Sequence, residues 1–236
     1  RVRDRYGLVR GLEGGGSYDP GAESYSLWVP STYRPGERHG LLVWISPTAF
    51  GGLRSEELKR LLAERRVIWI GANNAGNPRP VWERLSLALD AAQALPDFYD
   101  VDPRRVWIGG YSGGGRSASA LLLLFPEVFT GGLCWMGVDT FEEIPVPYKP
   151  GHSWSASFER PGRALWTRSR KRPLALVTGD RDFNRSETRA VGLALRARGL
   201  ERLLYLQIPD ADHYFGLRQP WIGQALDWLD AGDRGG

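Results

Sequence analysis

The sequence is poor in cysteine and histidine: its 236 residues include one cysteine, Cys134, and three histidines. A single cysteine excludes a disulfide within the chain, and without Cys/His pairs at zinc-ligand spacing we expect no structural metal. Apolar runs are short, and none reaches the ~18 residues that a membrane span needs. No Pro/Ser-rich linker or internal repeat interrupts the chain, so we expect one domain over residues 1–236.

The chain also lacks a concentrated charge of one sign. Its net charge is +4, and the arginines are spread along the chain beside acidic residues. The densest basic cluster spans residues 168–172 and precedes an apolar stretch, which favours a solvated strand entrance over a phosphate-binding patch. We therefore expect no nucleic-acid partner.

Tryptophan is abundant by contrast, with ten residues in an otherwise ordinary globular composition of 42% hydrophobic and 25% charged residues. A cleft lined by indole rings would suit aromatic, sugar or polymeric ligands. Packing in the core or at its rim is the alternative for each individual tryptophan.

Apolar runs of strand length alternate with stretches of helical periodicity along most of the chain. Residues 41–45 are the clearest strand, because an unbroken apolar run is typical of a parallel strand covered on both faces. Strict alternation predicts an α/β fold with three layers, in which helices cover both faces of a twisted, mostly parallel sheet of about eight strands. The expected strands are 6–10, 24–30, 41–45, 67–72, 106–108, 131–136, 173–178 and 203–208. The expected helices are 55–66, 80–95, 117–124, 185–198 and 220–231.

Residues 137–167 break this alternation with proline, glycine, serine and aromatic residues. An irregular insert of this length in a compact domain is usually functional. We expect it to cover the carboxyl edge of the sheet and to form part of a substrate pocket, with Trp154 as a binding residue. Packing of Trp154 and Phe158 against the body is the alternative.

A strand and a helix meet at the sequence Gly110-Tyr111-Ser112-Gly113-Gly114. This Gly-x-Ser-x-Gly pattern is typical of a nucleophile elbow, in which the serine occupies a strained corner and the flanking glycines avoid collisions. The pattern alone is a weak signal in a glycine-rich chain, and a structural turn is the alternative reading. Its position between an apolar strand and a helix favours Ser112 as a nucleophile. Tyr111 is then a candidate substrate-binding residue.

A serine nucleophile needs a base, and histidine is the usual one. His213 follows the last predicted strand and so lies at the edge of the sheet that carries Ser112. His39 precedes a strand, and His152 lies in the insert. His213 is therefore the predicted base.

An acidic residue must orient the base, which completes a catalytic triad. Asp180 and Asp182 both follow the strand at 173–178. Asp182 lies beyond the turn and can point toward the last loop, whereas Asp180 can cap the turn through its own backbone. We favour Asp182 over Asp180, and Asp139, which follows the strand at 131–136, is the third candidate.

The oxyanion hole is expected to consist of backbone N–H groups. The Gly113 N–H begins the helix after the elbow and is one donor. The loop after residues 41–45 should supply the second, and because Pro47 has no N–H, Thr48 or Ala49 is the candidate.

At these residues the chain resembles the α/β-hydrolase superfamily over nearly its full length. The stretch 99–115, which includes Asp102-Pro103-Arg104-Arg105 and the elbow, resembles bacterial esterases related to polyhydroxybutyrate depolymerases and to feruloyl or acetylxylan esterases. The resemblance implies an α/β-hydrolase fold, serine esterase activity, and neither a metal nor another cofactor. One departure concerns the second oxyanion donor: these esterases usually carry His-Gly where this chain has Ser46-Pro47.

The sequence therefore predicts a carboxylesterase that cleaves a small-molecule or polymer-linked ester through an acyl-enzyme intermediate. A serine peptidase of the prolyl-oligopeptidase type shares the elbow and the Ser, Asp, His order, but usually adds a large gating domain. A hydrolase fold retained for binding is the non-catalytic alternative, favoured by Ser46-Pro47.

The sequence starts at Arg1 rather than Met. A removed secretory signal and a trimmed chain would both explain this start, so secreted, periplasmic and cytoplasmic locations stay open. The oligomeric state has no sequence signal.

Overall fold

A seven-stranded sheet lies at the centre of the structure, a computed structural model that describes residues 18–231. Its strands are β1 (Tyr25–Trp28), β2 (His39–Ile45), β3 (Val67–Ala72), β4 (Val101–Tyr111), β5 (Gly131–Trp135), β8 (Leu174–Gly179) and β9 (Leu203–Ile208). They are arranged in the order β1-β3-β2-β4-β5-β8-β9. Only β1 is antiparallel to its neighbour, and the remaining pairs are parallel. The mostly parallel sheet of an α/β fold is therefore confirmed.

Seven of the eight predicted strands are present, and the expected strand at 6–10 lies outside the described residues. All seven residues of β2 are buried, as the unbroken apolar run predicts. Successive residues of β2 contact opposite layers: Leu41, Val43 and Ile45 belong to one apolar cluster, whereas Leu42 and Trp44 belong to the other. Alternate side chains of a strand point to opposite faces of the sheet. A strand that is apolar at every position therefore needs cover on both faces.

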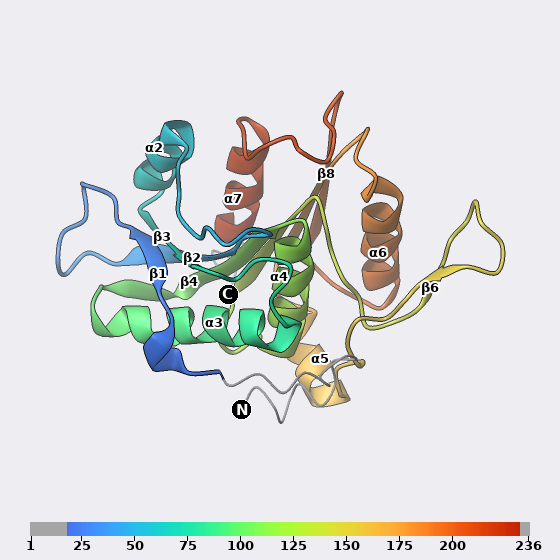
Figure 1. Cartoon of the computed structure of the whole chain (residues 1–236), viewed down its shortest axis with the longest axis horizontal. Coiled ribbons are helices and arrows are strands. Elements are labelled where there is room, and N and C mark those ends of the chain that lie inside the picture. The colour runs from blue at the N-terminus through green and yellow to red at the C-terminus, as the bar shows by residue number, and fades with distance from the viewer. Residues whose placement is uncertain (1–17, 232–236) are drawn as a thin grey trace.

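Helices provide that cover (Figure 1). They are α2 (Glu56–Glu64), α3 (Val81–Ala94), α4 (Gly113–Leu124), α5 (Arg163–Ser169), α6 (Arg185–Ala197) and α7 (Trp221–Ala231), with 3₁₀ turns η1 (Pro20–Ala22) and η2 (Leu95–Asp97). Apolar residues of α2 and α7 join the cluster of Leu42 and Trp44, while those of α3, α4 and α6 join the opposite cluster. The three predicted layers are present.

The insert is more ordered than its composition indicates. It contains a short hairpin of β6 (Ile144–Pro145) and β7 (Ser153–Trp154), followed by α5. Figure 1 shows the hairpin projecting from the body beside α6 rather than lying over the strand ends. Trp154 packs edge-on against Tyr148 of the same hairpin, with ring centroids 6.4 Å apart. Phe158 is buried in the core beside Phe141, so for Phe158 the packing alternative holds.

Candidate active site

Ser112 occupies a sharp corner between β4 and α4. Its backbone has φ 53° and ψ −119°, in a region that non-glycine residues rarely adopt and that costs on the order of 1–3 kcal/mol. Two hydrogen bonds hold the corner: the Ser112 N–H donates to the Trp135 carbonyl of β5 at 2.7 Å, and the Ser112 carbonyl accepts from the Arg116 N–H at 3.1 Å. A side chain at Gly114 would overlap the Ile45 carbonyl of β2, so the elbow needs glycine there. The strand, corner and helix predicted from the sequence are all present.

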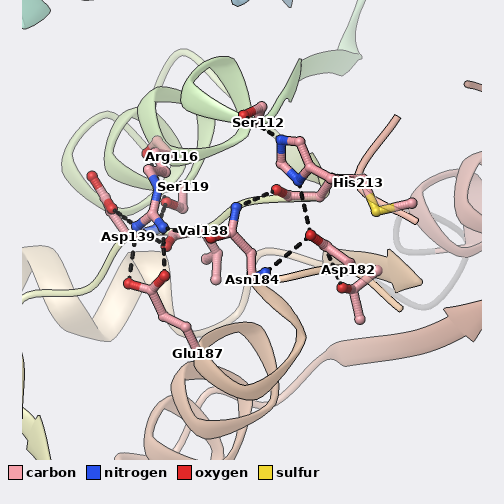
Figure 2. Close-up of polar contacts among 11 residues, drawn as sticks. Ser112, Arg116, Ser119, Val138, Asp139, Asp182, Asn184, Glu187 and His213 are labelled. Atoms are coloured by element: carbon pink, nitrogen blue, oxygen red, sulfur yellow. Dashed lines mark hydrogen bonds and ion pairs between the residues drawn. The ribbon is translucent and has the colours of Figure 1, made fainter. Parts of the chain in front are cut away.

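Three side chains from separate loops meet at this corner (Figure 2). His213 Nε2 lies 2.9 Å from Ser112 Oγ, and His213 Nδ1 lies 2.8 Å from Asp182 Oδ1. Ser112 follows β4, Asp182 follows β8 and His213 follows β9, so the parallel strands deliver all three to one edge of the sheet. The Asp182 side chain is 0% exposed and that of His213 is 7% exposed. Asp182, His213 and Ser112 thus form a continuous, largely buried hydrogen-bonded chain.

Three donors fix the orientation of the Asp182 carboxylate. Besides His213, the Thr178 hydroxyl donates to Oδ2 at 2.7 Å and the Asn184 backbone N–H donates to Oδ1 at 3.0 Å. A carboxylate held at both oxygens cannot rotate away from the imidazole without breaking hydrogen bonds in a buried site, which is costly.

The other two candidate carboxylates have different partners. Asp139 is paired with Arg116 at 2.8 Å. Asp180 lies in the turn after β8, where its backbone N–H donates to the Ile208 carbonyl. Among the three acidic residues considered from the sequence, Asp182 is the one that bonds His213. The remaining histidines are elsewhere: His39 begins β2, and His152 is exposed in the hairpin.

Three aromatic residues contact the imidazole, and one of them, Tyr214, is the next residue in the chain and meets it edge-on with centroids 5.5 Å apart. The Phe183 ring stacks on it with centroids 4.0 Å apart and planes at 29°, although 70% of Phe183 is exposed. Tyr111 meets it edge-on at 5.9 Å, and the Tyr111 hydroxyl donates to the His213 backbone carbonyl. Burial, reinforced by the negative charge of Asp182, raises the pKa of Tyr111 to about 12, so the phenol stays a donor at neutral pH. The sequence places Tyr111 at the site but gives no signal for Phe183.

The predicted oxyanion donors differ in their surroundings. Gly113 is the first residue of α4, where backbone N–H groups point out of the helix. The Thr48 N–H donates to the Ser46 hydroxyl at 3.1 Å. A side chain at Gly113 would overlap the carboxamide of Asn77, so a further polar group lies directly beside the elbow. Sequence reasoning does not identify Asn77, because its position depends on the path of the loop after β3.

A cavity of about 250 Å³ opens beside the first turns of α4. Val81 and Leu85 of α3, Ser117 and Ala120 of α4, and residues 156–158 of the insert contribute to its wall. The insert therefore does line a cavity beside α4, through residues 156–158 and not through Trp154. Within residues 18–231 no group of three or more His, Cys, Asp or Glu side chains could hold a metal ion, and no helix is long and apolar enough to cross a membrane.

Comparison with known proteins identifies the fold. No protein-family model and no curated protein matches the chain. Solved structures do match. The thermostable carboxylesterase EstE1 from a metagenomic library has a TM-score of 0.64 at 15% identity, with 89% of this chain and 85% of that chain covered. The protein FAE has a TM-score of 0.60 at 13% identity, with 87% of this chain and 82% of that chain covered. A thermostable esterase has a TM-score of 0.54 at 16% identity, and the match covers 91% of this chain and 58% of that longer one. The chain therefore has the α/β-hydrolase fold found in these esterases.

Proposed function

We propose that the chain is a serine carboxylesterase with Ser112 as nucleophile, His213 as general base and Asp182 as the residue that orients the base. The observation that carries the proposal is the hydrogen-bonded chain from Asp182 through His213 to the Ser112 hydroxyl. A serine hydroxyl is a weak nucleophile near neutral pH, and an adjacent imidazole removes its proton as the attack proceeds. The strained backbone at Ser112 presents that hydroxyl at the strand edge.

The reaction takes place in two steps. Ser112 Oγ bonds to the ester carbonyl carbon while its proton passes to His213 Nε2, and the C–O bond to the alcohol then breaks as His213 returns the proton to the leaving oxygen. Water next attacks the acyl-enzyme, giving one proton to His213, and the carboxylic acid leaves as Ser112 Oγ regains that proton.

Backbone N–H groups would stabilise the negative charge that develops on the carbonyl oxygen. The Gly113 N–H is the first donor. We propose the Thr48 N–H as the second, released from its hydrogen bond to the Ser46 hydroxyl when substrate binds. In this proposal the Thr48 N–H takes the place of the second oxyanion donor in the esterases that the sequence resembles, which usually carry His-Gly at this point of the chain.

The proposed substrate is a small-molecule or polymer-linked ester. The Phe183 ring stacks on the imidazole and is 70% exposed, so it offers an apolar surface beside the site that suits contact with a bulky substrate. The resemblance of residues 99–115 to polyhydroxybutyrate depolymerase and feruloyl esterase sequences makes hydroxyalkanoate and hydroxycinnamate esters the first compounds to test.

Ser112→Ala tests the proposal directly. Removing the nucleophile should lower kcat on a short-chain nitrophenyl ester by about ten-thousand-fold or more. Ser153→Ala, in the exposed hairpin, is the matched control and should retain wild-type kcat. Substantial activity in Ser112→Ala would contradict the assignment. A phosphonate reagent that fails to label Ser112 would instead favour the non-catalytic alternative, and hydrolysis of a matched amide as fast as the ester would favour a peptidase.

A further inference from the structure

A cluster of charged and polar side chains lies directly behind the proposed triad, on the side facing α6 (Figure 2). Arg116 is at its centre, one helical turn after Ser112. Its guanidinium donates to the Val138 carbonyl at 3.1 Å, to Asp139 Oδ1 at 2.8 Å and to both carboxylate oxygens of Glu187. It also donates to Asn184 Oδ1 at 3.3 Å. One side chain of α4 thus joins the loop after β5 to the start of α6.

Asn184 connects this cluster to the triad. Its side-chain amide donates to the Met136 carbonyl at 2.9 Å, while its side-chain oxygen accepts from Arg116. Both ends of the carboxamide are therefore bound, and the residue is buried. Its backbone N–H, held in place by these contacts, is the group that donates to Asp182 Oδ1. Asn184 thus contacts both Arg116 and Asp182 and links the two.

Charge stabilises the arrangement. Burial acts to lower the pKa of Arg116, but hydrogen bonds and attraction from Glu187 and Asp139 outweigh it and raise the pKa above its ordinary value. The guanidinium is thus a permanent cation between two carboxylates. Removing one partner of such a partly buried set would leave a charge unpaired, which is costly, so the ion pairs oppose displacement of Arg116.

We propose that Asn184 and Arg116 are positioning residues for the reaction: Asn184 holds the Asp182 carboxylate, and Arg116 holds Asn184. This inference rests on the proposed esterase function. Neither residue reaches the reacting atoms. Each acts by keeping Asp182 aimed at His213, which fixes the imidazole against Ser112. A shift of about 1 Å in such a chain can cost up to a hundredfold in rate.

Kinetics provide the first test. Asn184→Ala should lower kcat about tenfold with KM unchanged, because the substrate is not touched. Asn184→Asp keeps the acceptor for Arg116 but loses the donor to the Met136 carbonyl. Its kcat should lie between those of wild type and Asn184→Ala. Arg116→Met is combined with Glu187→Gln so that one charge of each sign is removed. Arg198→Met, which breaks an ion pair with Glu142 outside the cluster, is the control and should keep wild-type kcat.

A double-mutant cycle separates positioning from general loss of structure. If Asn184 acts through Asp182, Asn184→Ala should have no further effect on kcat in an Asp182→Asn background. Fully additive effects, or unchanged kcat in both Asn184→Ala and the Arg116→Met/Glu187→Gln variant, would overturn the proposal. Should either of these unfold, Asn184→Asp carries the same comparison.

A spectroscopic readout does not depend on activity. The chain has three histidines, so the proton shared between His213 Nδ1 and Asp182 can be assigned by NMR in labelled protein. Its exchange with solvent should be faster in Asn184→Ala than in wild type, and unchanged in Arg198→Met. Equal exchange in all three would overturn the inference even if the esterase proposal held. Faster exchange in Asn184→Ala without any esterase activity would refute the proposed function alone.

Discussion

Asp180 and Asp182 are two residues apart and have opposite surroundings. The side chain of Asp182 is fully buried and accepts hydrogen bonds from His213, Thr178 and Asn184. Asp180 is only half-buried, and its carbonyl accepts from Arg185 at 2.6 Å. Two carboxyl groups of the same kind therefore lie in different surroundings: Asp182 is bound at both oxygens, whereas Asp180 Oδ1 has no hydrogen-bond partner in the part of the chain that the structure describes.

Exchanging each carboxylate for an amide should distinguish the roles of the two residues. Asp182→Asn preserves shape but offers His213 the wrong partner, so kcat on a nitrophenyl ester should fall by about ten-thousand-fold. Asp180→Asn is the matched control and should keep kcat within about threefold of wild type. Steady-state kinetics of both purified variants measure the difference. Equal losses would show that the turn as a whole, and not Asp182, supports activity.

The sequence predicts the residues of the candidate triad and one neighbour, Tyr111, but not the neighbours that lie on loops. Ser112, Asp182 and His213 each follow a predicted parallel strand, and parallel strands end at a common edge. Phe183, Asn184 and Asn77 are missed because their roles depend on where loop side chains point. No periodicity encodes that direction.

At the scale of elements, the elbow depends on close backbone contact between β4, α4 and β2. A methyl group at Gly110 would overlap the backbone of Gly114, and one at Gly114 would overlap the Ile45 carbonyl. At Gly113 the obstructing atoms belong to the end of the Asn77 side chain, which can move. The three glycines of the elbow are therefore unequal.

Alanine at these positions should reveal that inequality. Gly114→Ala should lower the free energy of unfolding by about 2–4 kcal/mol, because backbone must shift against backbone. Gly113→Ala should cost less than about 1 kcal/mol, since Asn77 can rotate away. Urea unfolding followed by fluorescence measures both. A Gly113→Ala variant as unstable as Gly114→Ala would show that Asn77 is held rigidly.

The elements themselves divide into those that sequence patterns predict and those that they do not. β2 is predicted because its apolar run is unbroken, and α2 because apolar residues recur at helical spacing. Ser55 caps α2, accepting from the Leu58 N–H at 3.2 Å. The β6–β7 hairpin has strands of two residues, too short to display a period. Contacts such as that of Phe141 with Phe158 fix the path of the insert. These contacts join residues that are far apart in the sequence, so no local pattern predicts them.

At the scale of the whole molecule, strand β5, which lies between β4 and β8 inside the sheet, carries the single cysteine. Cys134 is 0% exposed, within the cluster that packs beneath α3 and α4. Complete burial raises the pKa of the thiol well above its ordinary value, because the thiolate would lose its hydration. The folded molecule therefore keeps Cys134 neutral and inaccessible.

This burial makes Cys134 a reporter of global unfolding. A disulfide reagent should not label the native protein, and labelling should follow the unfolded fraction as guanidinium is raised. The pKa of the Cys134 thiol is higher in the folded protein than in the unfolded chain. The stability that comes from burying the neutral thiol is therefore fully present below the ordinary thiol pKa, and it is lost as pH rises above that value. Rapid labelling without denaturant would reveal an opening of the sheet centre that the structure does not contain.

The β6–β7 hairpin leaves the body and returns to nearly the same point, since Ile144 pairs with Trp154 at its base. When the ends of a loop are paired in this way, a change in its length costs little free energy and does not move the strands next to it. Additional polypeptide could therefore be accommodated at its tip, around Tyr148, without displacing any strand that carries Ser112, Asp182 or His213. An insertion at the tip of this hairpin should therefore leave the edge where the chemistry is proposed to occur unchanged.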